Sequence, residues 1–160
     1  MEKATECLDP WYVTGVVEGE GCFTVSFTFR EKLKVGIETR PSFSISLNQR
    51  DLSLIESLHA FFGCGAVRFS KGDRTYKFES RSTKDLVNRI IPHFERYPLR
   101  GSKANDFRIF ASICRKVHGN LHMNREYLRE IIEEAYQMNP SGKRRHEVRD
   151  LLRRLGELKV

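Results

Sequence analysis

Two segments of the chain alternate strictly between apolar and polar residues, and this period of two restricts the possible folds more than any other feature. In residues 22–30 the odd-numbered positions are Phe or Val and the even-numbered ones are Cys, Ser, Thr or Arg. Residues 42–48 repeat the pattern, and two shorter segments, 67–69 and 76–78, flank a Lys-Gly-Asp turn. Such alternation is typical of antiparallel strands that bury only one face. The sequence therefore predicts four antiparallel strands that share one polar face.

Apolar residues with helical spacing occupy the regions around these strands. They occur over residues 9–19, 52–62 and 82–91, and again over 103–117, 124–138 and 143–158. Asp9 and Ser82 are suitable helix caps, and Gly63 is a stop signal. Residues 31–41 are charged and contain glycine, which predicts a mobile hairpin connection. The order of elements predicts an α+β fold with an α-β-β-α-β-β-α core and additional C-terminal helices.

The length and composition predict one soluble domain of 160 residues, with a core over about 9–117 and a helical extension over about 118–160. No apolar run is long enough to cross a membrane, and the first residues do not resemble a signal peptide. The four cysteines are widely separated, so we expect reduced thiols and no zinc site. The prediction is an intracellular protein, of the prokaryotic cytoplasm or an organelle, with neither a membrane partner nor a small-molecule substrate.

The polar face of the predicted sheet is rich in hydroxyl groups and cations and poor in carboxylates, in a chain of net charge +7. Hydroxyl and guanidinium groups read base edges, and Lys and Arg bind phosphates. No aromatic cluster suits stacking on single-stranded bases, so a nucleic-acid duplex is the predicted partner. The alternative is a solvated face, although that would normally mix in more acids. The predicted DNA-binding residues are Thr24, Ser26, Thr28, Arg30, Arg40, Ser42, Ser44, Ser46, Arg68, Ser70, Lys77 and Arg81.

Two carboxylates separated by glycine, in the sequence Glu18-Gly19-Glu20-Gly21, stand at the junction of the first helix and the first strand. Phosphodiester hydrolysis uses metal ions held by several oxygens, and one carboxylate is too few. A homodimer whose first helices pack together would bring two copies of Glu20 close to a twofold axis. The predicted dimer interface comprises Val13, Gly15, Val16 and Gly19. The alternative is that both glutamates are solvated turn residues.

The segment 13–21 resembles the nine-residue signature of the LAGLIDADG homing endonucleases. Three further landmarks follow in the family's order: residues 43–51 resemble its second strand and helix entry, 62–67 its Phe-Gly-x-Gly turn, and 97–103 its Pro-Leu segment before a basic residue. The resemblance covers residues 9–117. Thr14 departs from the family's common alanine at a helix seam, and glutamate replaces aspartate at both acidic positions.

This resemblance implies a saddle-shaped sheet in the DNA major groove and a homodimer that cuts a long, nearly palindromic target in intron homing. It implies Mg²⁺, or another divalent cation such as Mn²⁺, held by Glu20 and the carbonyl of Gly19. Gln49 corresponds to a residue that orders water, and Lys103 or Arg100 to the basic residue beside the scissile phosphate. An RNA-binding intron maturase and an inactive DNA-binding regulator on the same scaffold are the alternatives. In residues 118–160 we expect the cations to coat surface helices, except in the loop 143–146, which we expect to reach phosphates.

Overall fold

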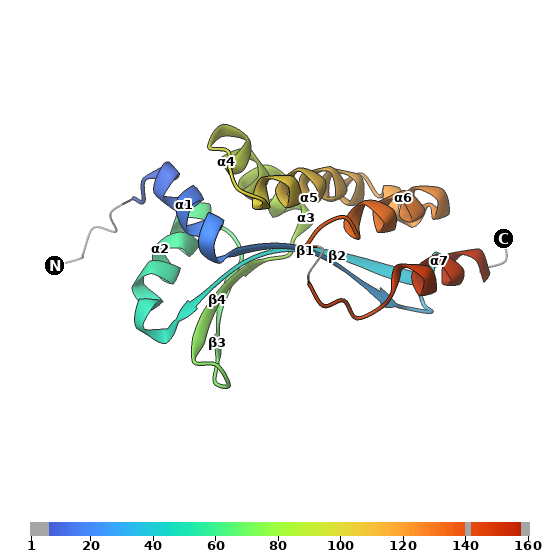
Figure 1. Cartoon of the computed structure of the whole chain (residues 1–160), viewed down its shortest axis with the longest axis horizontal. Helices are drawn as coiled ribbons and strands as arrows, with labels where there is room; N and C mark the ends of the chain where they lie inside the picture. The colour runs from blue at the N-terminus through green and yellow to red at the C-terminus, as the bar shows by residue number, and fades with distance from the viewer. Residues whose placement is uncertain (1–6, 140–141, 158–160) are drawn as a thin grey trace. The chain divides into compact units, whose positions relative to one another are not determined.

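The computed structural model describes residues 7–139 and 142–157. Four strands form one antiparallel sheet in the order β1-β2-β4-β3, which confirms the predicted α+β fold (Figure 1). No helix within the described residues is long and apolar enough to cross a membrane. The elements are α1 (Pro10–Glu20), β1 (Gly21–Phe29), β2 (Ile37–Asn48), η1 (Gln49–Asp51), α2 (Leu52–Phe62), β3 (Ala66–Ser70), β4 (Thr75–Ser80), α3 (Thr83–Asp85), η2 (Leu86–Ile90), α4 (Ile91–Arg96), α5 (Lys103–His118), η3 (Leu121–Met123), α6 (Arg125–Ala135) and α7 (Val148–Glu157).

The chain divides into two compact units. The first comprises Met1–Cys22 and Ser42–Ala104, and the second comprises Phe23–Pro41 and Asn105–Val160. Each long strand, β1 and β2, therefore contributes to both units. The organisation as a single domain stays a prediction, and each unit is described separately below.

In the first unit, helix α1 begins and ends for reasons that the sequence supplies. The carboxylate of Asp9 accepts hydrogen bonds from the backbone N–H groups of Trp11 (2.8 Å) and Tyr12 (3.2 Å), as an N-cap residue should. At the other end, a Cβ atom on Gly21 would lie 2.4 Å from Cγ1 of Val17 and 2.9 Å from its carbonyl oxygen. Only glycine therefore allows the chain to pass directly from α1 into β1.

The core of the first unit is built from aromatic rings on β2, β4, α2 and α4. Phe43 on β2 packs with its ring centroid 5.5 Å from that of Phe62 and 5.6 Å from that of Phe94. Phe62 stacks on Phe78 of β4 at 5.7 Å, and all four rings are buried. Helix α2 lies against β3 and β4 (Figure 1) and ends at Gly63, whose φ of +65° favours glycine. The polar face of these strands lies opposite this core.

The third predicted helix, over residues 82–91, is interrupted by a wider turn and continues past Pro92. The hydroxyl of Ser82 accepts a hydrogen bond from the N–H of Asp85, which confirms the predicted cap. The chain then widens into a π turn, η2, immediately before α4, and α4 carries Pro92 in its first turn. Proline has no N–H to donate to the preceding turn, and a widened turn accommodates this. The helical segment therefore continues through Pro92 to Arg96.

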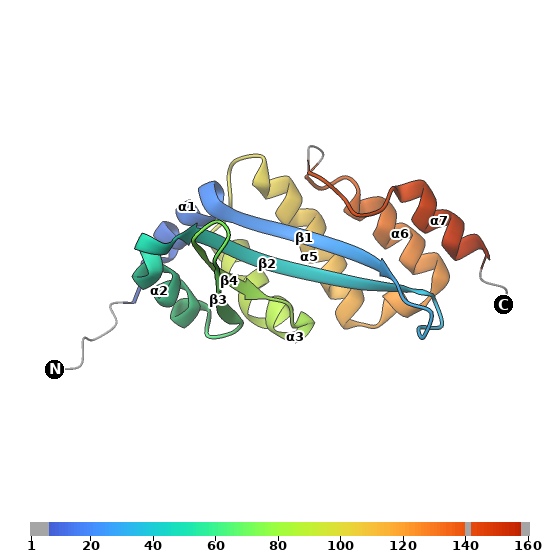
Figure 2. The same cartoon turned by 90° about the horizontal axis from the view of Figure 1, so that it is seen from below.

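In the second unit, α5 and α6 lie on one face of the hairpin formed by β1 and β2, as the view from below shows (Figure 2). Phe23 of β1 packs against Phe107 and Phe110 of α5, with centroids 5.5 and 5.2 Å apart. Phe27 stacks on Tyr136 after α6 at 6.4 Å. The buried side chains of β1 therefore face the helices, and its alternate, polar side chains face away from them.

Two boundaries in the second unit differ from the predictions. Strand β2 begins at Ile37 rather than at residue 42, because Ile37, Thr39 and Pro41 continue the buried alternation. Only one of these three is strongly apolar, so the sequence pattern was too weak to extend the strand. Helix α7 begins at Val148 rather than at residue 143. The five residues before it remain outside the helix, and Arg144 bonds to the end of α6, with a nitrogen 2.5 Å from the carbonyl oxygen of Ala135.

Candidate active site and nucleic-acid interface

The motif at the end of α1 is held by backbone groups that lie more than 80 residues away in the sequence. The carboxylate of Glu18 accepts hydrogen bonds from the N–H groups of Arg100 (3.1 Å) and Gly101 (3.0 Å). Glu18 is therefore not a solvated turn residue, and its carboxylate ties the segment before α5 to α1. Sequence reasoning missed this role, because it depends on a loop that no local pattern brings to the motif.

Lys103 lies against the same end of α1. Its ammonium group donates hydrogen bonds to the carbonyl oxygens of Val17 (2.9 Å) and Glu18 (3.0 Å) and is partly buried. The last carbonyls of a helix have no partners within it and carry partial negative charge, so a lysine is favourable there. Of the two predicted cations, Lys103 therefore contacts the motif through its side chain, whereas the exposed Arg100 contacts it through its backbone N–H.

The oxygen donors that the resemblance assigns to a metal are exposed at this end of the helix. Glu20 and Gly19 are both exposed, at the last two positions of α1. Carboxylate and carbonyl oxygens are the ligands that hard divalent cations prefer, so these two residues fit Mg²⁺ or Mn²⁺ by donor type. Gln49 is also exposed and opens η1, where its N–H donates to the carbonyl of Arg74 at 2.8 Å. Residues 7–139 and 142–157 contain no group of three or more His, Cys, Asp or Glu side chains that could hold a metal ion.

One face of α1 is open. No described atom outside the local helix lies within 4 Å of a Cβ built on Gly15 or Gly19, so the two glycines serve no close approach inside the described protomer. Val16 is half-buried and Tyr12 is 49% exposed beside them. Val13, by contrast, is fully buried in its own protomer and cannot contribute to a free surface. The predicted dimer surface is corrected by removing Val13, because the helical period turns it toward the core.

The opposite face of α1 is fixed by a buried polar contact. The hydroxyl of Thr14 donates to the carbonyl of Tyr97 (2.9 Å), so it accepts from Nε2 of His93 (3.0 Å). His93 is buried among aromatic rings, and this burial lowers its pKa to about 4. The neutral imidazole with its proton on Nε2 satisfies the geometry. Thr14, which departs from the family's alanine, thus has a partner on α4, and sequence reasoning missed His93 altogether.

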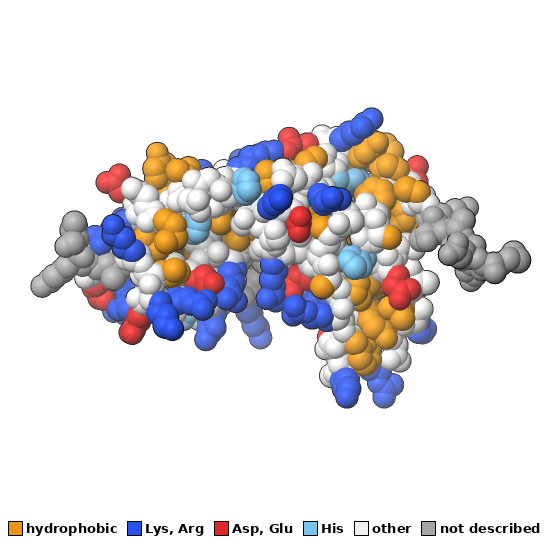
Figure 3. All heavy atoms as spheres, turned by 180° about the vertical axis from the view of Figure 1, so that it is seen from behind, with side chains coloured by type: hydrophobic (Ala, Val, Ile, Leu, Met, Phe, Trp, Pro, Cys, Tyr) orange, Lys and Arg blue, Asp and Glu red, His pale blue; other side chains and the backbone are white. Residues whose placement is uncertain are grey.

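The polar strand face of the first unit carries the side chains that the alternation predicted. Ser46, Arg68, Ser70 and Arg81 are exposed, and Ser42, Ser44 and Lys77 are half-buried. In the cross-strand register Ser46 faces Lys77, and Lys77 faces Arg68. The view from behind shows further Lys and Arg side chains at the tip of the β3–β4 hairpin (Figure 3). This face is therefore accessible and cationic.

The second unit presents its own polar strand face on β1 and β2. Thr24, Ser26, Arg30 and Arg40 are exposed, and Thr28 is half-buried. The hydroxyl of Ser26 donates to the carbonyl of Arg40 at 3.4 Å, which places these residues on neighbouring strands. All twelve predicted DNA-binding residues are thus accessible, five on the second unit and seven on the first.

The C-terminal extension uses several of its cations internally. Arg144 donates to the carbonyls of Ala135 and Met138 and stacks over Tyr136, with its guanidinium carbon 4.3 Å from the ring centroid. One guanidinium nitrogen of Arg144 is thus engaged by carbonyls at and just after the end of α6, and the expectation that the 143–146 loop reaches phosphates stays a prediction. Lys143 and Arg145 of the same loop are exposed.

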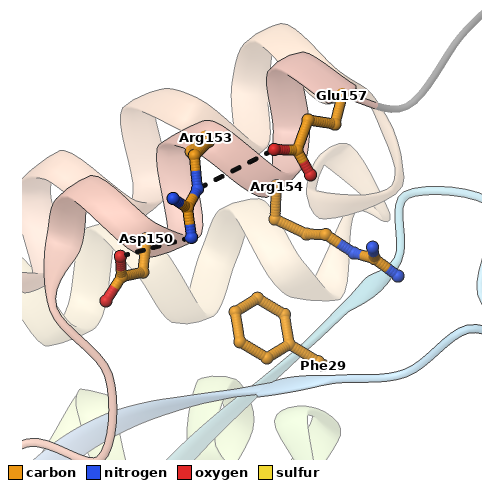
Figure 4. Close-up of a pocket in the computed structure, with 5 residues that line it drawn as sticks. All are labelled: Phe29, Asp150, Arg153, Arg154 and Glu157. Carbon is orange, nitrogen blue, oxygen red and sulfur yellow. Dashed lines mark ion pairs between the residues drawn. The ribbon is translucent and has the colours of Figure 1, made fainter.

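A hollow of about 310 Å³ lies between Phe29 of β1 and α7 (Figure 4). Arg153 on its rim stands between two carboxylates, 3.7 Å from Asp150 and 3.8 Å from Glu157. The basic and acidic groups of the rim therefore offset one another. This hollow has no excess of positive charge to attract a polyanion.

Comparison with known proteins connects this geometry to one family. The sequence model of a family described as LAGLIDADG endonuclease matches residues 13–114, well over half of the chain. A curated relative from Neurospora crassa, a probable intron-encoded endonuclease, is 30% identical over 138 residues, which are 86% of this chain and 26% of the relative. The matched part of this chain spans about a quarter of the length of the relatives from Podospora anserina and Neurospora crassa, and 47% of a relative from Mycosarcoma maydis.

Solved structures agree with this assignment. The crystal structure of a homing endonuclease, I-TnaI, has a TM-score of 0.81 and 34% identity, and covers 95% of this chain and 99% of its own. The crystal structure of I-LtrWI, a LAGLIDADG homing endonuclease bound to target DNA, has a TM-score of 0.81 and 34% identity. That match covers 87% of this chain but only 47% of the I-LtrWI chain.

Proposed function

Because the chain belongs to the LAGLIDADG endonuclease family, we propose that it is a metal-dependent, site-specific DNA endonuclease that works as a homodimer. The observation that carries this proposal lies at the end of α1. Gly19 and Glu20 are exposed there, and the ammonium group of Lys103 donates hydrogen bonds to the carbonyl oxygens of the two preceding residues. An acidic oxygen donor and a cation at one helix end are among the groups that metal-dependent phosphodiester hydrolysis uses, and a second protomer would supply the further carboxylate.

The reaction needs a nucleophilic water and stabilisation of negative charge on the phosphate. Glu20 and the carbonyl of Gly19 would hold the Mg²⁺ or Mn²⁺ ion, which when bound activates water and stabilises the leaving oxygen. Gln49, with an exposed amide side chain, would orient that water. Lys103 would stabilise charge on the phosphate, and its hydrogen bonds to Val17 and Glu18 preorganise the ammonium group for this role.

The homodimer follows from the open face of α1. A helix face with Gly15 and Gly19 allows another helix to approach closely, and such a contact would bring two copies of Glu20 together. The lengths of the similar structures support two copies, because this chain matches nearly all of I-TnaI but about half of I-LtrWI. A twofold dimer binds a nearly palindromic site, and one helical turn of duplex per protomer gives a target of about 20 bp.

The polar strand faces would then contact the DNA. Their hydroxyl and guanidinium groups suit the base edges of a major groove, and the remaining cations suit phosphates. I-LtrWI is bound to target DNA in its structure, which supports a DNA duplex as the partner here. We therefore propose that each protomer reads one half of the target through the two faces described above.

The test is cleavage of a randomised duplex library with Mg²⁺, with Ca²⁺ and the Glu20→Gln variant in parallel reactions. We expect discrete products enriched for a nearly palindromic sequence. Glu20→Gln should lose at least ~100-fold in cleavage rate, because the amide removes a charged ligand, while its binding changes by less than about threefold. Glu56→Gln, an exposed acid on α2, is the matched control and should cleave normally.

Each other outcome points to a different function. Enrichment of a sequence without cleavage by the wild-type protein would indicate a DNA-binding regulator. Preferential retention of a folded intron RNA, with no enrichment of duplex DNA, would indicate a maturase. Unchanged cleavage by Glu20→Gln would contradict the role assigned to this carboxylate.

A further inference from the structure

Two glutamates stand among the cations of the polar strand faces, one in each unit, and neither belongs to the active site. Glu79 on β4 accepts a hydrogen bond from Ser42 (2.8 Å) and forms ion pairs with Lys77 (3.3 Å) and Arg81 (2.8 Å). On β2, Glu38 pairs with Arg30 (2.6 Å) and Arg40 (3.1 Å). In both units one carboxylate therefore holds two of the cations predicted to contact DNA.

Both carboxylates are less exposed than the cations they hold. The side chains of Glu79 and Glu38 are 13% and 24% exposed, whereas Lys77, Arg81, Arg30 and Arg40 are 44–53% exposed. Each carboxylate thus lies at the base of a cluster, and the cations reach outward from it. Ser42, Lys77, Glu79 and Arg81 share one strand face, because the register places Glu79 opposite Ser44 and Lys77 opposite Ser46.

The electrostatics keep both acids charged. Burial by itself would raise the pKa of Glu79, but the hydrogen bonds from Ser42 and Arg81 and the charge of Lys77 lower it overall. The hydrogen bond from Arg30 lowers the pKa of Glu38, against the smaller effect of burial, and Arg40 adds to it. At neutral pH each acid therefore cancels part of its cluster's positive charge and restricts the directions in which the guanidinium groups can point.

We propose that Glu79 and Glu38 are specificity-determining positioning residues, which orient the arginines toward base edges and suppress sequence-independent binding to phosphates. The proposal rests on the proposed function as a DNA endonuclease. An arginine already held in one geometry loses less side-chain entropy when it bonds a guanine. A cluster with less net charge gains less from phosphate neutralisation, which is the sequence-independent part of binding.

This role predicts a result that distinguishes it from a purely structural one. Glu79→Gln should bind random duplex more tightly and show a steeper dependence on salt, by about one unit of slope per protomer. Its discrimination at one or two base pairs in each half of the target should fall by about tenfold. Loss of a merely structural residue would instead lower affinity for all sequences equally and leave the base preferences unchanged.

The experiment compares sequence selection from a randomised duplex library by the wild-type protein, Glu79→Gln and Glu38→Gln. Glu56→Gln and Glu130→Gln make the same charge change at exposed positions on helices and should keep the wild-type profile. Glu79→Asp retains the charge but shortens the side chain, so it should relax specificity without changing the salt slope. If the wild-type protein enriches a duplex sequence and both Gln variants keep the same base preferences and salt dependence, the inference is overturned. The proposed function would still stand.

A second measurement needs no DNA. The guanidinium NMR signals of Arg81, assigned with Arg81→Lys, should show slow rotation in the wild-type protein and fast rotation in Glu79→Gln. Fast rotation in the wild-type protein would overturn the inference even if DNA binding is confirmed. If the wild-type protein enriches no duplex sequence, the proposed function fails and the inference fails with it.

Discussion

The end of α1 and the polar strand faces both present charged groups, but different parts of the protein hold them. At the end of α1, Glu18 and Lys103 bond to backbone N–H and carbonyl groups. On the strands, Glu79 and Glu38 bond almost entirely to other side chains. A backbone N–H or carbonyl group remains available for a hydrogen bond when its residue is substituted, whereas a side-chain partner is lost with the substitution. The comparison indicates that the proposed chemistry depends on the fold, and that the proposed base reading depends on replaceable residues.

The largest effect is expected where backbone groups hold the site. Lys103→Met removes both hydrogen bonds to the carbonyls of Val17 and Glu18 and the cation at the helix end. We expect cleavage to fall about 100-fold and the free energy of unfolding to fall by about 1–2 kcal/mol. Cleavage assays and urea denaturation measure the two effects. Lys84→Met, at an exposed lysine of α3, is the control and should keep wild-type cleavage and stability. Equal cleavage rates and unfolding free energies in the two variants would contradict the role given to the end of α1.

A pH-dependent effect, confined to stability, is expected from the contact that fixes the other face of α1. His93 has a pKa of about 4 in the folded protein and about 6.5 in the unfolded chain. Between these values the unfolded chain binds a proton that the folded protein does not. The contribution of His93 to stability is therefore complete above pH 6.5 and is lost as the pH falls toward 4, by up to about 3 kcal/mol.

Urea denaturation of the wild-type protein and of His93→Asn between pH 7.5 and 4 measures this contribution. The difference in unfolding free energy between the two should shrink as the pH falls. His118→Asn, at an exposed position on α5, should track the wild-type protein throughout. A difference that stays constant over this range would show that His93 titrates normally in the folded state.

The narrowest effects, limited to DNA binding, are expected on the strand faces, and two arginines sharpen the comparison there. Arg81 is paired with Glu79, whereas Arg68 has no ion-pair partner within residues 7–139 and 142–157. Arg81→Ala should relax one base position by ~1–3 kcal/mol, since a held guanidinium can read a base edge. Arg68→Ala should weaken binding to all sequences and reduce the salt slope by about 1, as expected of a phosphate contact. Binding to a panel of single-base variants separates the two, and identical profiles would contradict the distinction.

Much of the fold could be predicted because its signals are local. The alternation in β1 and β2, the cap at Asp9 and the stop at Gly63 each depend on residues close together in the sequence. The start of β2 was missed, because two of the residues buried there, Thr39 and Pro41, are not strongly hydrophobic. The start of α7 was missed, because Arg144 donates hydrogen bonds to the carbonyls of Ala135 and Met138 and stays outside the helix, and helical spacing in the sequence does not reveal these tertiary contacts.

The candidate site shows the same division. The sequence by itself determined the acidic motif, the polar strand face and the two glycines on one face of α1, since each follows from residue type and spacing. Only the tertiary structure decided that Glu18 anchors a loop, that Lys103 bonds to the end of α1, and that Val13 turns inward. It alone revealed the partners of His93, Glu38 and Glu79. The physical reason is that a hydrogen bond or ion pair depends on distance in space, and in the cases of Glu18, Lys103 and His93 the partners lie about 80 residues apart in the chain.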